Sequence, residues 1–240
     1  MSRIFLTGDV HATNDIIKIV NFADTEGKTL TKDDKLIILG DFGFIFDWNP
    51  DGNEREEYWL NWFDKQPWTT LFLDGNHENF NRLNDYNTYP LQEYYGGKVS
   101  KINDSLFHLL RGEVYNFNNN RFLILGGADS IDRYFRVEDF SWWRQETISR
   151  DDINLALKNA GDGKVDYVLT HAGPTSFLKE LYKKKLLAPY NELEISISEK
   201  RLERLKNKID YNKWYCGHYH CDYSKGNIET LYNKIIELPI

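Results

Sequence analysis

Cysteine is scarce in this sequence of 240 residues, which contains only Cys216 and Cys221. Two cysteines are too few for the disulfide framework of a secreted protein, so we expect both to be reduced thiols. No apolar run approaches the ~18 residues that a membrane-spanning helix needs. Residues 1–15 also lack the basic start and the apolar stretch of a signal peptide. We therefore expect a soluble, cytoplasmic protein without a membrane partner.

Positive charge is in deficit. The sequence has 30 Lys and Arg against 37 Asp and Glu, which gives a formal net charge of −7. Broad binding to duplex nucleic acid depends on many Lys and Arg contacts with phosphate, so this balance argues against duplex DNA or RNA as a partner. The net negative charge is still compatible with a local basic groove.

Linkers, internal repeats and low-complexity tracts are missing, whereas core-forming residues are plentiful. Apolar residues make up 41% of the sequence and aromatic residues 15%, which is too much for a disordered chain. No stretch rich in Pro, Gly or Ser divides the sequence. We therefore expect residues 1–240 to form one globular domain.

Short apolar runs of strand length alternate with helical patterns along much of the sequence. The expected strands are 3–7, 35–39, 70–73, 165–170 and 213–216. The expected helices are 13–22, 54–63, a helix capped by Ser149 that stops near Gly161, and 195–209. This alternation predicts a largely parallel sheet in the first half.

The middle of the sequence has a different pattern. Strand-like runs follow one another closely there, at 98–102, 106–110, 113–117 and 122–125. Asn-rich or Arg-Gly turns separate them, the clearest being 118–120. We expect an antiparallel meander and a second sheet that packs on the first.

Histidine is the most informative residue type. Five of the six histidines follow an expected strand within a few residues, and only His108 lies inside one. The blocks at these strand ends are Gly8-Asp9-Val10-His11, Gly40-Asp41, Gly75-Asn76-His77-Glu78, Thr170-His171-Ala172-Gly173-Pro174 and Gly217-His218-Tyr219-His220. Any one block alone is more typical of an ordinary turn, but their combination indicates a metal centre.

Ligand chemistry supports this interpretation. In an extended chain, residues i and i+2 point the same way, so Asp9 with His11, and His218 with His220, are expected to be chelating pairs. Carboxylate, imidazole and amide oxygen together suit Mn, Fe or Zn better than Ca or Mg. The neighbouring glycines are expected to let the backbone turn sharply and approach a bound phosphate.

In this order, the five blocks resemble the motifs of the calcineurin-like metallophosphoesterase superfamily, in the form of its small bacterial and phage members. The resemblance spans Gly8 to His220 and implies an α/β fold, a four-layer α/β/β/α sandwich of two mixed sheets flanked by helices. It also implies two divalent or trivalent metal ions, of which Mn is expected and Fe and Zn are alternatives.

The resemblance further implies a role for each motif residue. One ion would be held by Asp9, His11, Asp41 and His220. The other would be held by Asp41, Asn76, His171 and His218, with Asp41 as the bridge. His77 corresponds to the histidine that binds no metal and protonates the leaving oxygen, and it is the expected catalytic residue.

One motif departs from the pattern of the phosphoprotein phosphatases. Those enzymes carry Gly-Asp-x-x-Asp-Arg-Gly, whereas Gly40-Asp41 continues here as Phe42-Gly43-Phe44. The missing Asp is the group that orients the general-acid histidine, and Asp47 and Asp74 are candidates to replace it. We therefore rank phosphoprotein phosphatase below a broader phosphoesterase.

A further segment, 126–146, resembles one found in small members of the superfamily. Its Arg133 and Arg136 are candidate substrate-binding residues because arginines clamp phosphate oxygens. Its Trp142 and Trp143 are candidates because an indole stacks on a base or another flat group. The alternative, that both tryptophans only anchor the loop to the core, carries about equal weight.

Together these features predict a dinuclear-metal hydrolase of phosphate esters, with attack by a metal-bound hydroxide. The expected substrate is a small molecule or nucleotide, as a phosphodiester or a phosphomonoester. Phosphoprotein phosphatase and nuclease are the alternative enzymes, and a nuclease would be expected to show an extended basic surface. The alternative outside enzymes is a binding scaffold with the same fold and a decayed centre, against which the retention of every ligand-type residue argues.

Overall fold

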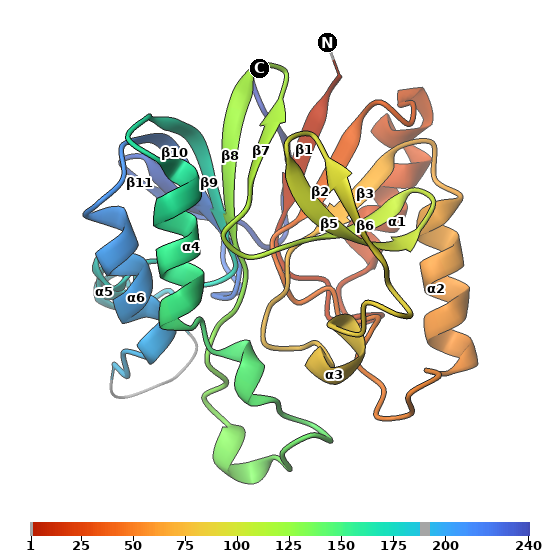
Figure 1. The fold of residues 1–240 in the computed structure, drawn as a ribbon, viewed down its shortest axis with the longest axis horizontal. Coiled ribbons are helices and arrows are strands. Elements are labelled where there is room, and N and C mark those ends of the chain that lie inside the picture. Colours follow the sequence, from red (N-terminus) through yellow and green to blue (C-terminus); the bar gives the residue numbers. More distant parts are fainter. Residues whose placement is uncertain (1, 188–192) are drawn as a thin grey trace.

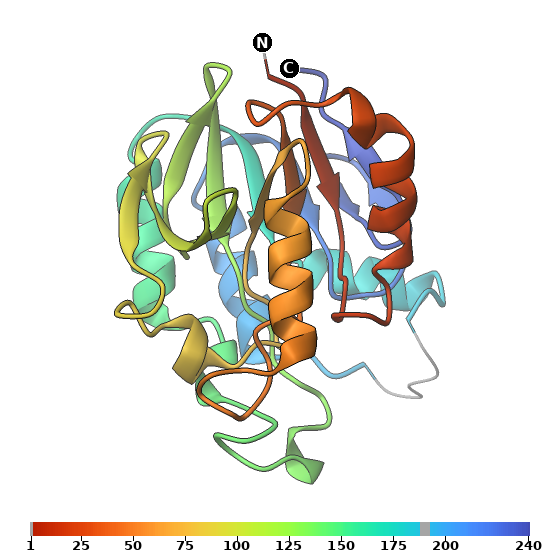
Figure 2. The ribbon, with the colours of Figure 1, turned by 90° about the vertical axis from the view of Figure 1, so that its right-hand side faces the viewer.

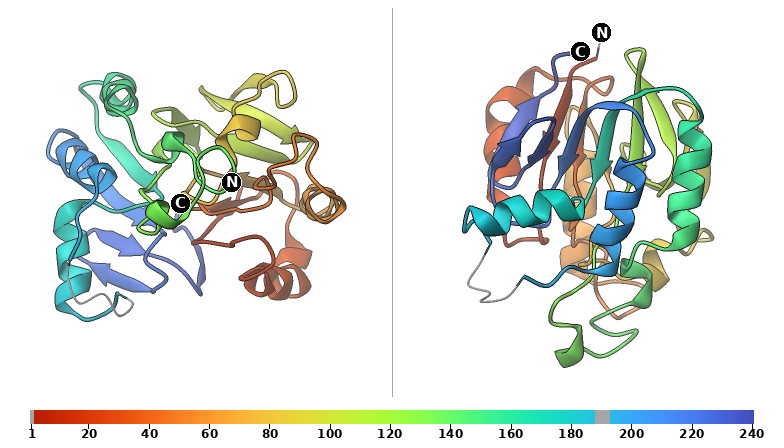
Figure 3. Two further views of the ribbon diagram at one scale, coloured as in Figure 1. Left: turned by 90° about the horizontal axis from the view of Figure 1, so that it is seen from below. Right: turned by 90° about the vertical axis from the view of Figure 1, so that its left-hand side faces the viewer.

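The computed structural model of the protein describes residues 2–187 and 193–240. Within these ranges the chain forms two mixed β-sheets that pack face to face, with helices on the outer side of each (Figure 1). The view from below shows the same arrangement (Figure 3, left), and each side view looks onto the helices of one outer face, with the sheets behind them (Figures 2 and 3). The expected α/β/β/α sandwich is therefore confirmed.

The first sheet has a parallel centre and antiparallel edges. Its strands are β1 (Ile4–Thr7), β2 (Lys35–Ile38), β3 (Thr69–Phe72), β4 (Leu91–Tyr94), β5 (Gly97–Asn103), β6 (Leu106–Leu109) and β13 (Ile235–Glu237). They lie in the order β13-β1-β2-β3-β6-β5-β4. The pairs among β1, β2, β3 and β6 are parallel, and β13, β5 and β4 join antiparallel.

The second sheet is built in the same way. Its strands are β7 (Val114–Phe117), β8 (Asn120–Leu125), β9 (Val165–Thr170), β10 (Tyr211–Cys216), β11 (Tyr223–Lys225) and β12 (Ile228–Thr230). They lie in the order β11-β12-β10-β9-β8-β7, with parallel pairing from β8 to β12. The parallel strands of both sheets therefore end in loops from which side chains can reach a shared site.

The helices cover the outer faces of the two sheets. They are α1 (Ile17–Asp24), α2 (Glu54–Asp64), α3 (Phe80–Leu83), α4 (Arg150–Ala160), α5 (Thr175–Lys183) and α6 (Ile197–Lys206), with short 3₁₀ turns η1 (Glu26–Thr29), η2 (Arg133–Phe135) and η3 (Arg144–Glu146). Helix α4 begins with the expected capping box of Ser149 and Asp152 and ends at Gly161. None of the described helices is long and apolar enough to cross a bilayer.

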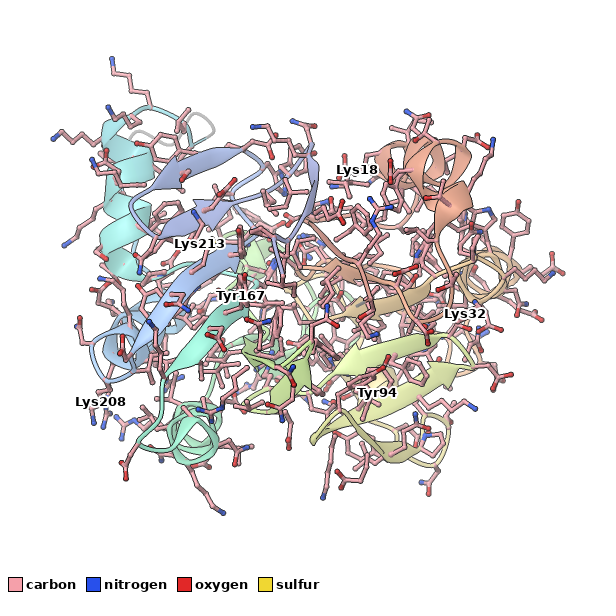
Figure 4. All side chains as sticks on the ribbon, turned by 90° about the horizontal axis from the view of Figure 1, so that it is seen from above. Lys18, Lys32, Tyr94, Tyr167, Lys208 and Lys213 are labelled. Atoms are coloured by element: carbon pink, nitrogen blue, oxygen red, sulfur yellow. The ribbon has the colours of Figure 1, made fainter. Side chains whose placement is uncertain are left out.

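Apolar side chains separate the layers. One buried cluster lies between the sheets and includes Leu6 and Leu71 from the first and Phe122 from the second. Tyr94 and Tyr167 pack against it from the two sheets (Figure 4). Separate clusters bind α1 and α2 to the first sheet, and α4, α5 and α6 to the second. Burial of these clusters supplies the main stabilisation of the sandwich.

The expected meander in the middle of the chain is wrong. β5 pairs antiparallel with β6 in the first sheet, whereas β7 pairs antiparallel with β8 in the second. The chain changes sheets between β6 and β7, because β6 also pairs with β3 and β8 also pairs with β9. Each hairpin thus extends a different sheet.

The segment between β8 and α4, in green, projects from the end of the molecule opposite the two termini (Figures 1 and 2). It contains η2 and η3. At that end, large apolar side chains are exposed, including Tyr134 at 80% and Phe135 at 93%. This segment includes the 126–146 motif.

Candidate metal centre

Backbone hydrogen bonds join the loops that follow β1 and β2, and those that follow β9 and β10, and the side chains of His171 and Asp9 connect the two pairs. Val10 N and His11 N donate hydrogen bonds to Asp41 O, over 3.0 and 2.8 Å. Gly217 N donates to His171 O over 2.9 Å. The motifs that are far apart in the sequence therefore converge at one end of the sandwich.

The side chains on these loops form two groups that share Asp41. Ligand atoms of the first group, and likewise those of the second, lie within 4.8 Å of one another. The first group is Asp9, His11, Asp41 and His220, and the second is Asp41, His171 and His218. The structure thus brings together all four residues expected for the first ion and, of the four expected for the second, Asp41, His171 and His218.

Each oxygen of Asp41 faces one group. Its Oδ2 lies 3.0 Å from His11 Nε2, and its Oδ1 lies 3.3 Å from His171 Nε2. Asn76 adjoins the second group, because its Oδ1 lies 3.3 Å from His171 Nε2. The arrangement is that of a carboxylate able to bridge two ions.

Asp9 supplies a direct test of whether a cation fits. Its Oδ1 accepts a hydrogen bond from the backbone N of His218 over 2.8 Å. Its Oδ2 is buried and accepts no hydrogen bond from the described residues, although His220 Nε2 lies only 3.2 Å away. A buried carboxylate oxygen without a partner is costly, and a cation between it and the imidazole would satisfy it.

Protons compete with a cation for the same atoms. Burial lowers the pKa of His171, but Asp41 and Asp9 outweigh it and raise that pKa to about 10. The same carboxylates outweigh burial at His11 and raise its pKa to about 9. At His218, burial and the neighbouring His171 lower the pKa to about 4. Because metal ligands must be deprotonated, an ion that binds here would displace protons from two imidazoles.

The backbone at four of the candidate ligands is not extended, which corrects the expected geometry. His11, Asp41, His218 and His220 all have positive φ, between 45° and 68°. Such left-handed conformations are uncommon outside glycine and concentrate at functional sites. Asp9 and His11 still contribute to one group, but His218 and His220 belong to different groups and are not a chelating pair.

Glycines make room for the carboxylates. A Cβ on Gly75 would lie 2.1 Å from Asp41 Oδ1, and a Cβ on Gly217 would lie 2.3 Å from Asp9 Oδ1. Any larger residue would displace the carboxylate at either position. These two glycines therefore leave room for the carboxylates, and the approach of the glycine backbone to phosphate stays a prediction.

Asp15, which sequence reasoning missed, orients the first group. Its Oδ2 lies 2.7 Å from His11 Nδ1, which turns the Nε2 of that ring toward Asp41. Its Oδ1 accepts a hydrogen bond from the Tyr232 hydroxyl over 2.9 Å. The Tyr232 ring stacks on His220 at 4.9 Å. Carboxylates that hold a ligand histidine in this way fix its tautomer, and the only local signal was an Asp four residues after His11.

Two further contacts hold the second group. His171 Nδ1 lies 2.7 Å from Leu39 O, and since a carbonyl can only accept, Nδ1 carries the proton and Nε2 is left for a ligand. The buried Glu78 accepts hydrogen bonds from Phe42 N and Gly75 N, over 2.8 and 2.9 Å. Glu78 therefore ties together the loops that carry Asp41 and Asn76.

His77 lies beside both groups without belonging to either. Its backbone N donates to Asp41 Oδ1 over 2.9 Å, and its ring lies 5.1 Å from that of His11. Burial is the largest cause that lowers its pKa; Asp41 opposes the change, and His11 and Arg136 add to it. A free imidazole at this position is suited to exchange a proton with a bound substrate.

The two carboxylates expected to orient His77 are engaged elsewhere. Asp47 accepts hydrogen bonds from Asn49 N and from the Asn53 side chain. Asp74 pairs with Arg111 and with His108, whose Nε2 lies 3.2 Å away. No hydrogen bond joins the His77 ring to another residue of 2–187 or 193–240.

Only some of the predicted substrate-binding side chains of the 126–146 segment lie near the two groups of candidate metal ligands. Arg136 lines a pocket beside them and pairs with Asp132 at 2.8 Å. Trp143 is 1% exposed and packs against Phe46, so its ring is not available to stack on a ligand. Arg133, which donates to the exposed Tyr134, and the half-buried Trp142 line neither of the two pockets described below. For Trp143 the core-anchor interpretation is the better one.

Within the described ranges, two pockets open beside the metal groups, and His77 lines both. The smaller has a volume of about 380 Å³ and is also lined by His11 and Arg55. The larger has a volume of about 820 Å³ and is also lined by His218 and Arg136. A molecule bound at the two groups of candidate metal ligands would therefore have space on two sides.

Comparison with known proteins identifies the family of the chain. The model of the calcineurin-like phosphoesterase family matches residues 2–222. No curated protein matches the sequence. One crystal structure superposes with a TM-score of 0.49 at 10% identity, covering 95% of this chain and 89% of the other. A protein of unknown function from Aquifex aeolicus gives 0.34 at 16% identity, covering 99% and 96%.

Proposed function

Given that the chain belongs to the calcineurin-like phosphoesterase family and is a metal-dependent phosphoesterase, we propose that it hydrolyses a phosphodiester at a pair of metal ions. The observation that carries the pair of ions is the division of the ligand atoms into two groups around Asp41. The choice of a diester as substrate rests on two pockets, both of which are lined by His77.

The residues that would hold the ions follow from the two groups. The first ion would be held by Asp9, His11, Asp41 and His220, and the second by Asp41, Asn76, His171 and His218. This mixture of carboxylate, imidazole and amide donors favours Mn, with Fe or Zn as alternatives. Such ions, when bound, neutralise phosphate charge and lower the pKa of water.

His77 is the proposed general acid. It stands outside the ligand groups and at the junction of the pockets, where a leaving group would emerge from the phosphate. An anionic phosphate beside the ring favours the protonated imidazole, which opposes the lowering of its pKa by burial and by its cationic neighbours. Its role is to give that proton to the leaving oxygen.

The pockets favour a diester over a monoester. A phosphomonoester carries one organic substituent, whereas a phosphodiester carries two, and both pockets adjoin the metal groups. The smaller pocket is polar at Asn14 and Arg55. The larger combines Arg136 with the apolar side chains of Ile131 and Phe135. We infer that one substituent is smaller than the other, and that the larger one is partly apolar.

A comparison of two simple substrates tests the proposal. After reconstitution with Mn²⁺, kcat/KM should be about tenfold or more higher for bis(4-nitrophenyl) phosphate than for 4-nitrophenyl phosphate, which corresponds to ~1.4 kcal/mol or more of transition-state binding. A chelator should abolish both activities. A preference for the monoester would overturn the diester assignment, and activity that survives the chelator would overturn the metal mechanism.

A further inference from the structure

Two buried polar side chains of the 126–146 segment stand directly behind Asn76. Ser130 is 4% exposed and Glu146 is 1% exposed. Asn76 Nδ2 donates to Ser130 Oγ over 3.2 Å, and Ser130 Oγ donates to Glu146 Oε2 over 2.9 Å. We propose that Ser130 and Glu146 are positioning residues that hold the Asn76 amide with its oxygen toward the second metal group. This inference rests on the proposed two-ion site.

The direction of the amide matters because its two ends differ chemically. The oxygen of an Asn side chain can bind a cation, whereas its NH₂ group can only donate hydrogen bonds. In the observed orientation Oδ1 lies 3.3 Å from His171 Nε2, among the atoms of the second group. A rotation of 180° about the last side-chain bond would present the NH₂ group to the ion instead.

The single proton of the Ser130 hydroxyl determines the orientation of the Asn76 amide. A hydroxyl has one proton, and a carboxylate can only accept once it is ionised. Burial raises the pKa of Glu146 to about 7, so its carboxylate is ionised above that pH. Because Ser130 gives its proton to Glu146, its oxygen is left to accept from the NH₂ group of Asn76. The backbone N of Ser130 also donates to Glu146 Oε1 over 2.6 Å, which holds the carboxylate in place. Ser130 Oγ therefore accepts a hydrogen bond from the Asn76 side chain and has no proton to donate to it.

Glu146 is itself held from behind. Its backbone O accepts a hydrogen bond from Arg111 Nη2 over 3.2 Å. Arg111 donates through Nε to Asp74 over 2.8 Å, and Asp74 lies on the same loop as Asn76. The buried Trp143 packs the start of the same 3₁₀ turn, η3, into the interior. These contacts make a closed path from Asn76 through Glu146 back to its own loop.

The same segment also lines the larger pocket. Ser130, Ile131 and Arg136 are all among its lining residues, together with Asn76. The wall proposed to receive a substrate substituent is thus continuous with the residues that orient a metal ligand. A change at Ser130 or Glu146 should act on the ion and not only on the substrate.

Metal titration of the metal-free protein tests the inference without substrate. Wild-type protein should bind two Mn²⁺ ions by calorimetry. In Ser130→Ala and in Glu146→Gln, one of the two should bind ~10–100-fold more weakly, as for other residues that orient metal ligands, while the other is unchanged. Electron paramagnetic resonance should show a coupled Mn²⁺ pair in wild type and mostly a single ion in both variants at the same Mn²⁺ concentration.

Matched controls come from the same segment. Ser141→Ala and Glu138→Gln repeat the two substitutions away from Asn76, at the half-buried Ser141, which contacts Val137, and at the exposed Glu138, which pairs with Arg144. Both controls should bind two ions as wild type does. Melting temperatures of all variants show whether a loss of affinity reflects unfolding.

Two results would overturn the inference. One is wild-type affinity for both ions in Ser130→Ala, which removes only a hydroxyl and so decides the matter even if Glu146→Gln does not fold. The other is an equal loss of both ions together with a lowered melting temperature, which would give the pair a structural role. A wild-type protein that binds two ions but hydrolyses no diester would refute the proposed function and leave this inference standing.

Discussion

Replacement of Trp143 by alanine tests whether this residue belongs to the core or to the substrate site. The side chain is 1% exposed and packs against Phe46, so its removal leaves a cavity. Truncation of a buried Trp costs ~3–5 kcal/mol in the free energy of unfolding. The indole Nε1 has no hydrogen-bond partner in the described part of the chain, so the variant also removes an unsatisfied donor, which offsets ~1–3 kcal/mol.

From the midpoints of these two ranges, the net effect should be a loss of ~2 kcal/mol, or about 4–8 °C in Tm for a chain of this length. Trp143→Phe keeps a ring and removes the unsatisfied N–H, so it should cost less than ~1.5 kcal/mol. Chemical denaturation gives the free energies, and kcat/KM on large and small esters gives the substrate ratio. A Trp143→Ala protein with wild-type Tm and a loss confined to large esters would refute the assignment to the core.

The remaining predictions concern the general acid, the support of the first group and a buried ion pair. His77→Ala should lower kcat by ~10²–10⁴ with both ions still bound, and the loss should shrink for esters with acidic leaving groups; an equal loss across leaving groups would contradict proton transfer. Asp15→Asn should weaken one ion by ~10–100-fold in a Mn²⁺ titration, and unchanged affinity would show that it does not orient His11. Burial raises the pKa of Asp74, but Arg111 and His108 outweigh it and lower that pKa, so its contribution to stability is present above its ordinary pKa and is lost as pH falls through the lower folded-state value. Denaturation of Asp74→Asn from pH 7 to pH 2 should therefore show lower stability at pH 7 and a shallower decline in acid, and a decline parallel to wild type would argue against the pair.

The sequence by itself determined the central strands of both sheets, the helices α1, α2, α4 and α6, and the candidate ligands, but it did not predict α5 or the strands β4, β11, β12 and β13. Strand patterns and turn residues are local signals, and β9 lies where 165–170 is predicted while α4 keeps its Ser149 cap. Asp9, Asp41 and His171 were found because each follows a parallel strand. The carboxyl ends of such strands meet at a common edge, so their position in the sequence already placed these residues together.

Which sheet each hairpin joins was decided only by tertiary structure. The patterns at 98–125 predict turns and antiparallel pairs, and those pairs exist. Local patterns do not tell which further strand each hairpin pairs with. In the structure these strands are β3, which pairs with β6, and β9, which pairs with β8, and both come from distant parts of the chain. The left-handed backbone at His11 and His218 has the same origin, since non-glycine residues hold it only where surrounding contacts impose it.

The supports of the metal groups also depended on tertiary structure. Trp143 was a candidate substrate-binding residue because it is aromatic, but its burial follows from tertiary packing, which composition does not reveal. Ser130 and Glu146 are ordinary residue types, and their meaning lies in their distance from Asn76, which is 54 positions from Ser130 in the sequence. A ligand at a strand end carries a local signature, whereas the group behind it is recognised only once the chain has brought the two together.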